Sequence, residues 1–324
     1  VQTCALPIYQ IVVALRELGR PVEYIVAPDE GHGFAGRENR LAMFAAIEEF
    51  LAGHLGGRYQ KGGLPEVEER LEEITVDVET VELAEPKEGA EDAMTAPLPE
   101  VRAEALEPAT LAYHSKAVLG AGRELEVDTT VELARDEVAG ERMWRVTAES
   151  ESPMGHGTDV FLLDADTLAA VRRDVSQGPV TMEVVYGEEG ITGAMTMGTQ
   201  EMSVELKDAP PVFGDENALS PALVALPLAE GYTTTLRTFD LQRQKVRAWK
   251  AAVEGRESVT VPAGEFEAFR ISLEPLDDLG GRAVIWVSAD EPRAVVRSEA
   301  TLAPQMGGGS VVTELVSREL GTTE

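Results

Sequence analysis

The sequence of 324 residues predicts an α+β fold that is mainly β, and three observations support this prediction. Over residues 9–64, apolar residues recur at helical spacing on both sides of a short apolar run. Residues 65–107 are dominated by acidic residues and prolines. Over residues 108–320 the hydrophobic period changes to two and turn residues recur, which predicts an antiparallel, partly open β-barrel.

The pattern of the first region is helix, strand, loop and helix. Residues 9–18 form the first predicted helix, and residues 22–26 form a short apolar strand, which we expect to be buried and parallel to its neighbours. The second helix is expected over residues 37–55. Its apolar stripe at spacings of three and four predicts that one face packs on a core; the stripe consists of Leu41, Phe44, Ile47, Leu51 and Leu55.

Residues 1–8 match one reading frame of a common sequencing adapter. We expect them to be an artefact joined to the gene; the alternative is a natural extended N-terminus. The single cysteine, Cys4, lies in this segment and cannot form an intramolecular disulfide.

The second region, residues 65–107, carries a strong excess of negative charge. Fifteen Asp and Glu residues stand against Arg70, Lys87 and Arg102. A short helix is predicted around residues 66–74, and residues 84–108 are predicted to be an acidic, mostly disordered linker. We assign no binding role to this acidic run.

The third region carries the pattern of short strands. Leu125, Val127 and Val131 alternate with charged residues, as do Trp144 and Val146. One helix is predicted near residues 220–228, with Ser220 as its N-cap and Pro221 at its first position. Further strands are expected at residues 159–163, 168–175, 180–186, 191–197, 201–206, 232–239, 245–253, 256–261, 266–273, 282–287, 293–302 and 310–316.

Composition excludes several functions. The net charge of −30 argues against nucleic-acid and anionic-membrane partners, since both would be repelled. The absence of a run of about 18 apolar residues predicts no membrane-spanning helix. His and Cys spacings do not match a zinc site, and we expect neither a metal nor a cofactor. We interpret His54, His114 and His156 as structural.

The loop at residues 29–34, Asp-Glu-Gly-His-Gly-Phe, carries the strongest functional signal. Together with the preceding strand and the following helix, residues 10–60 resemble the C-terminal tail of serine peptidases of the prolyl oligopeptidase family, which have an α/β-hydrolase domain. This resemblance implies that His32 is the histidine of the catalytic triad, a general base that activates a serine. It also implies a peptide substrate for the full-length parent.

The partners of His32 are missing from the sequence. In this family the chain order is serine, acid, histidine, but no G-x-S-x-G motif occurs and the first serine is Ser115. The aspartate would lie shortly before residue 10. We therefore predict that this chain alone is inactive and that only its parent gene encodes a serine peptidase.

Residues 108–318 are similar to secreted or periplasmic bacterial β domains of unknown activity, with a fold like the lipoprotein-carrier half-barrels. The resemblance favours a periplasmic or extracellular location and implies no catalytic residue. Trp144, Trp249 and Trp286 could hold an apolar ligand in the mouth of the sheet or fill its core, and we favour the core. The alternative function is therefore a ligand-binding or structural β module of the cell envelope without enzymatic activity.

Overall fold

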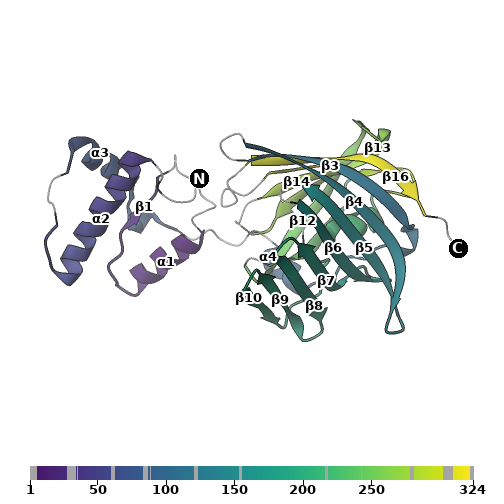
Figure 1. Ribbon diagram of the computed structural model, residues 1–324, viewed down its shortest axis with the longest axis horizontal. Coiled ribbons are helices and arrows are strands. Elements are labelled where there is room, and N and C mark those ends of the chain that lie inside the picture. The colour runs from purple at the N-terminus through teal and green to yellow at the C-terminus, as the bar shows by residue number, and fades with distance from the viewer. Residues whose placement is uncertain are drawn as a thin grey trace. The chain divides into compact units, whose positions relative to one another are not determined.

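The structure is a computed structural model that describes residues 6–27, 34, 36–59, 63–82, 87, 89–119, 123–152, 155–215, 218–241, 243–277, 281–301 and 309–321. The chain divides into two compact units, one formed mainly by residues 1–85 and the other containing the large sheet. The units are described separately below, and Figure 1 labels the elements of both.

The first unit is a small helical assembly with one two-stranded sheet. The predicted helices are present, but the predicted parallel strand is wrong: the two residues of β1 pair antiparallel with β2, with Tyr24 opposite Val76. The partner strand comes from the acidic region, to which no strand was assigned. The elements of this unit are α1 (Leu6–Glu17), β1 (Tyr24–Ile25), α2 (Arg37–Leu55), α3 (Pro65–Ile74), β2 (Thr75–Val76) and the 3₁₀ turn η2 (Val78–Thr80).

Helix α2 buries a different face from the predicted one. Its buried residues are Asn39, Ala42 and Ala46, and Ala42 joins Val67 and Ile74 of α3 in a small apolar cluster. The predicted stripe is exposed instead, from 39% at Leu41 to 79% at Leu55. The small alanine side chains let α3 approach closely, and the larger apolar side chains point away from this contact.

The acidic stretch before the sheet is more ordered than predicted. Its described residues include helix α4 (Ala90–Thr95) and the 3₁₀ turn η3 (Ala103–Ala105). Ala93, Ala103 and Leu106 are buried, whereas the acidic residues between them remain exposed. The prediction of a disordered linker is therefore wrong for these residues, because the apolar residues between the acids pack into the second unit.

The second unit is built on one antiparallel sheet of 14 strands. Strands pair with their neighbours in sequence except at the centre, where the first strand, β3, pairs with the last, β16. Strands β10 and β11 form the two edges. The strands are β3 (Ala109–Leu119), β4 (Arg123–Val138), β5 (Glu141–Ser152), β6 (Gly155–Asp164), β7 (Ala170–Gln177), β8 (Val180–Gly187), β9 (Gly190–Met197), β10 (Gln200–Lys207), β11 (Thr233–Asp240), β12 (Lys245–Val261), β13 (Gly264–Pro275), β14 (Arg282–Ser288), β15 (Val295–Thr301) and β16 (Gly309–Leu320).

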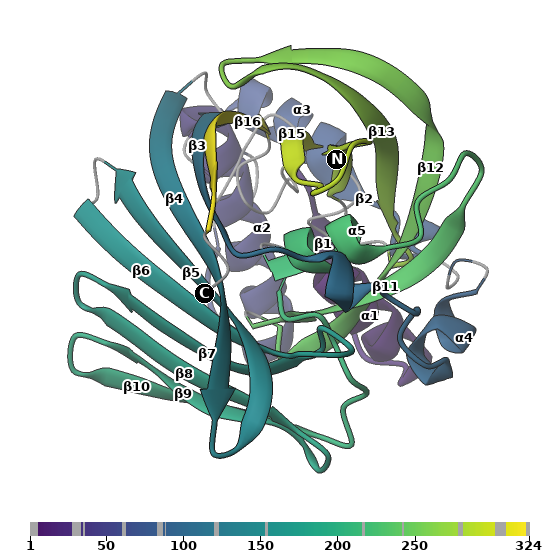
Figure 2. The same ribbon diagram turned by 90° about the vertical axis from the view of Figure 1, so that its right-hand side faces the viewer.

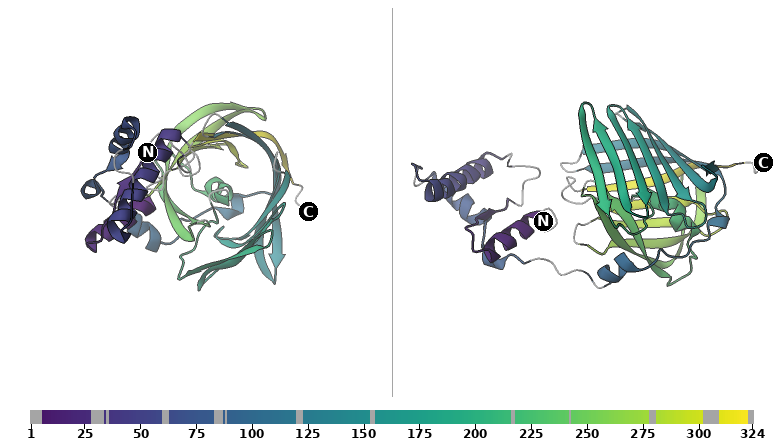
Figure 3. Two further views of the ribbon diagram at one scale, coloured as in Figure 1. Left: turned by 60° about the vertical axis from the view of Figure 1, so that its left-hand side comes forward. Right: turned by 90° about the horizontal axis from the view of Figure 1, so that it is seen from below.

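The sheet curls around the short helix α5 (Leu219–Ala225), as Figure 2 and the left panel of Figure 3 show. The predicted mainly β, antiparallel and barrel-like character is confirmed. Two local predictions are wrong. The strands expected at 245–253 and 256–261 are one strand with an irregularity between Val253 and Gly255. Helix α5 begins two residues earlier than predicted, so that Ala218, not Ser220, is its N-cap.

The three tryptophans lie in the core of the sheet unit. Trp144, Trp249 and Trp286 are 3%, 4% and 7% exposed. The indole N–H of Trp249 donates to Thr238 Oγ1 at 2.9 Å, and that of Trp286 donates to Glu257 Oε1 at 2.6 Å. These bonds satisfy the single polar group of each of the two rings, as buried indoles require.

Candidate ligand-binding cavity

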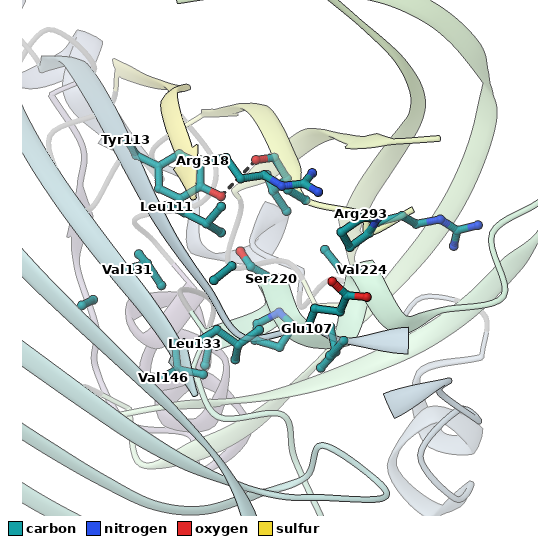
Figure 4. A pocket seen from close by; sticks show the side chains of 18 of the residues that line it. Glu107, Leu111, Tyr113, Val131, Leu133, Val146, Ser220, Val224, Arg293 and Arg318 are labelled. Carbon is teal, nitrogen blue, oxygen red and sulfur yellow. Dashed lines mark hydrogen bonds between the residues drawn. The ribbon is translucent and has the colours of Figure 1, made fainter. Parts of the chain in front are cut away.

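A cavity of about 130 Å³ lies between α5 and the inner face of strands β3 to β6. The segment before β3 and the ends of β15 and β16 complete its wall, and Figure 4 shows it from close by. The lining residues are mostly apolar: Leu106, Glu107, Ala109, Leu111, Tyr113, Val131, Leu133, Val146, Ala148, Asp159, Phe161, Leu163, Ala218, Ser220, Pro221, Val224, Pro292, Arg293, Ala294, Val295, Arg318 and Leu320.

Strand alternation explains why these side chains share one wall. Leu111 stands opposite Val131 across β3 and β4, and Leu133 stands opposite Val146 across β4 and β5. Val146 is in turn opposite Phe161 on β6. Residues directly opposite each other in an antiparallel sheet project from the same face, so these pairs form a continuous apolar surface.

The cavity is deep on one side and reaches solvent on the other. Leu163, Leu106 and Phe161 are 1%, 3% and 4% exposed, whereas the lining residues Glu107 and Ser220 are exposed. An apolar cavity of about 150 Å³ is enough to hold benzene. The space therefore suits a slender apolar group, and it is smaller than the roughly 300–1,000 Å³ typical of drug-sized ligands.

Tyr113 and Asp159 are polar residues of the cavity lining, and both form hydrogen bonds with other residues of the chain. The hydroxyl of Tyr113 donates to the carbonyl oxygen of Val295 at 3.0 Å. Burial raises the pKa of Tyr113 well above its ordinary value, and the positive charge of Arg318 partly opposes this rise. Asp159 accepts from Arg173 through both carboxylate oxygens, at 3.0 and 2.7 Å.

The two arginines of the lining differ in their partners. Arg293 donates through Nη1 to the carbonyl oxygen of Leu226 at 3.1 Å, and its Nε lies 3.3 Å from Glu291 Oε1. This Nε is buried and the contact lacks hydrogen-bond geometry, so we count it as an ion pair only. The guanidinium of Arg318 forms neither a hydrogen bond nor an ion pair with another described residue of the chain.

The predicted catalytic residue, His32, lies outside the described residues. The adjoining Phe34 is described and packs against the cluster of Ala42, Val67 and Ile74. The other three histidines are not among the residues that line the cavity. His54 contacts the ring of Phe50, with ring centroids 4.4 Å apart. His114 pairs with Asp128 and His156 with Glu151.

Sequence reasoning did not identify the cavity residues. Alternation marks Val131 or Leu133 as facing inward, but it does not distinguish a cavity from a filled core. None of the three tryptophans lines the cavity. Over the described ranges, His, Cys, Asp and Glu side chains do not gather in a group that could hold a metal ion. Among the described helices, none has the length and apolar character needed to cross a membrane.

Residues 116–316 match the model of a family described as protein of unknown function, DUF3108. The chain belongs to the DUF3108 family. This match extends from within β3 to within β16, and so includes most of the sheet that encloses the cavity.

Three solved structures are similar in fold to this DUF3108 chain at low identity. A β-barrel-like DUF1849 protein of Brucella abortus is 12% identical, with a TM-score of 0.46, and covers 68% of this chain and 100% of its own. An exported protein of YmcC-like fold from Bacteroides fragilis is 13% identical, with a TM-score of 0.31 and coverages of 66% and 96%. A DUF1329 protein of Desulfovibrio piger is 8% identical, with a TM-score of 0.30 and coverages of 74% and 95%.

A short part of the chain is similar to a peptidase. Over 54 residues it is 52% identical to dipeptidyl aminopeptidase BIII of Pseudoxanthomonas mexicana. The match covers 17% of this chain and 8% of that protein, so the chain spans less than a tenth of the length of that relative.

Proposed function

We propose that the DUF3108 unit is a binding module that holds a small apolar ligand in the cavity beneath α5. The observation that carries this proposal is an apolar space, walled by buried residues such as Leu106 and Leu163, that reaches solvent beside Glu107 and Ser220. The module has no enzymatic role in this proposal.

The energetics of packing support a binding role. Protein interiors are close-packed, and an unfilled space costs roughly 24 cal/mol per Å³. The apolar lining of this cavity of about 130 Å³ is incompletely packed, so the fold lacks part of the contact free energy that a filled core would have. An apolar ligand that occupies the cavity would recover part of this free energy.

The test is to fill the cavity with a larger side chain. Val131 faces the cavity from β4, so Val131→Trp should occupy the space that a ligand needs. The probe is toluene, a small neutral apolar molecule that suits a cavity of this size, and isothermal titration calorimetry measures its binding. We expect the native chain to bind it and Val131→Trp to weaken binding at least about tenfold, a loss of about 1.4 kcal/mol.

The matched control is Val118→Trp on the neighbouring strand β3. Val118 is 37% exposed and does not line the cavity, so this variant should bind the probe as the native chain does. Thermal unfolding of both variants checks that each is folded. Absence of binding by the native chain, or equal binding by folded Val131→Trp, would contradict the proposal.

We propose as a second function that residues 10–60 derive from a serine peptidase of the prolyl oligopeptidase type. In this proposal His32 is the triad histidine, and peptides are the substrates of the full-length parent. The support is the loop sequence around His32 and the 54-residue match to a dipeptidyl aminopeptidase.

The chain of 324 residues should itself be inactive as a peptidase, because it contains no G-x-S-x-G motif to supply a nucleophile for His32. We expect no labelling by a serine-directed fluorophosphonate and no hydrolysis of a dipeptidyl substrate, with the peptidase relative as a positive control. Labelling of a serine together with turnover would refute the prediction of inactivity.

A further inference from the structure

We propose that the ligand of the cavity is an amphipathic anion, with an apolar tail against the sheet and a carboxylate or phosphate head bound by Arg318. This inference rests on the proposed binding function and specifies the chemical class of the ligand.

Arg318 is placed on the cavity wall by the pairing of the first and last strands of the sheet. It stands directly opposite Leu111, which stands opposite Val131 on the next strand. The row continues through Ala148 to Asp159. All five residues line the cavity, so the cation lies at one end of a row that is otherwise apolar as far as Asp159.

The charge of Arg318 has no counterion among the described residues. The acid of its own row, Asp159, is four strands away, which is about 19 Å along the sheet at the usual strand spacing. Asp159 is also bound by Arg173, which pairs in addition with Asp215 at 2.7 Å. Glu107 is exposed elsewhere on the lining and forms no ion pair with Arg318.

Acidic residues outnumber basic residues about two to one in this chain, with 58 Asp and Glu against 28 Lys and Arg. Arg173 and Arg247, which are both largely buried, each pair with aspartate. Arg318 is partly buried and faces an apolar space. Partial burial of a charge is unfavourable unless it is paired, and an anionic ligand would supply the missing partner.

The surroundings of Arg318 suit the head of such a ligand. Arg318 and Tyr113 lie close together on the cavity wall (Figure 4). The hydroxyl of Tyr113 is already bound to Val295, which leaves Arg318 as the cationic donor there. Figure 4 shows Arg318, Tyr113 and Ser220 around the apolar side chains of Leu111, Val131 and Leu133, where the tail would lie.

The experiment compares ligands that differ only in the head group. Isothermal titration calorimetry at pH 8 measures binding of decanoate, decyl phosphate and 1-decanol to the full chain. We expect at least one of the two anions to bind about tenfold more tightly than the alcohol, which corresponds to about 1.4 kcal/mol. Whichever anion binds more tightly distinguishes a fatty acid from a phosphate-bearing lipid.

Two variants connect this preference to Arg318. In Arg318→Gln the affinity ratio of anion to alcohol should fall to about one. The matched control is Arg282→Gln on β14, since Arg282 is exposed and outside the cavity, and it should keep the native ratio. Circular dichroism melts confirm that both variants are folded.

The possible failures are distinguishable. If none of the three ligands binds, the cavity function itself is wrong. If 1-decanol binds as tightly as both anions, or if folded Arg318→Gln keeps the native ratio, the cavity function stands and the anionic head is wrong.

Discussion

His114 and Asp128 face each other across β3 and β4 and make the local stability of the sheet depend on pH. His114 Nδ1 lies 2.8 Å from Asp128 Oδ1. The hydrogen bond that His114 donates to Asp128 raises the pKa of His114; burial opposes this rise, and the charges of Asp128, Glu126 and Glu314 add smaller increases. Because the folded pKa is raised, the pair stabilises the fold fully below about pH 6.5, and this contribution is lost as pH rises through the folded pKa.

We predict that Asp128→Asn returns the pKa of His114 towards its ordinary value. A titration of the imidazole C–H signals by NMR should show a pKa above 6.5 in the native chain and a clear decrease in the variant. The control is Glu126→Gln, which removes only a weaker charge effect and should cause a smaller decrease. An unchanged pKa in Asp128→Asn would show that the hydrogen bond is not the cause.

Arg237 shows how one buried side chain fixes a helical element. It is 2% exposed, and its Nη1 donates to the carbonyl oxygens of Ala93 and Ala96 at the end of α4. Its Nε donates to the carbonyl oxygen of Pro211 at 2.9 Å. Carbonyl groups at a helix C-terminus need partners from outside the helix, and Arg237 of β11 supplies them for α4.

We predict that Arg237→Met lowers the free energy of unfolding by roughly 3–5 kcal/mol, since it leaves three carbonyl oxygens without their donor. Urea unfolding followed by circular dichroism measures this loss. The control, Arg282→Met, changes an exposed arginine and should alter stability by no more than about 0.5 kcal/mol. A loss below about 1 kcal/mol in Arg237→Met would mean that α4 is not held by this side chain.

Local patterns predicted element types well. Helical spacing predicted α2 with its observed bounds, and period two predicted most strands of the sheet. The face of α2 that packs against α3 was not predictable. Both its stripe of large apolar residues and its face of small alanines could pack against another helix, and the alanine face is the one that is buried. The ordered structure of the acidic stretch was not predictable, because its composition is that of a disordered segment. Only a few apolar residues, such as Ala93 and Leu106, pack into the core.

The cavity was not predictable, because its volume depends on elements that are distant in sequence. Leu106, Val224 and Arg318 line the same space, although they come from a coil segment, a helix and the last strand. Alternation places each residue on a face but does not give the distance between faces. The resemblance to β half-barrels predicted the curled sheet but did not predict which residues form the wall of the cavity.

At the scale of the whole chain, the boundary of the β unit is testable by truncation. The residues around α4 and η3 belong with the sheet, because Ala103 and Leu106 lie in its core and the backbone N–H of Arg102 donates to Ala225 O of α5 at 2.7 Å. The β unit should therefore begin near residue 87, and not near residue 108 as the charge pattern predicts.

We predict that a chain of residues 87–324 unfolds at the same temperature as the β unit within the full chain. A chain of residues 108–324 should unfold roughly 10 °C lower, because it loses the burial of Leu106 and the partners of Arg237. Differential scanning calorimetry measures both transitions. Equal melting temperatures for the two shortened chains would show that residues 87–107 contribute nothing to the sheet.

The pairing of β3 with β16 joins two runs of strands that are neighbours in sequence, β3 to β10 and β11 to β16. Each run can form from contacts that are local in sequence, whereas the central pair joins Leu119 to Gly309 and Ala109 to Leu320. Contacts of such long range carry the greatest loop-closure entropy and form slowly. Tyr113 and Arg318 come from the two sides of this pair, so the cavity can exist only after the slowest class of contact has formed. Only the completely folded sheet would then bind the ligand. The bound ligand would in turn stabilise the pairing of β3 with β16, which holds the two runs of strands together.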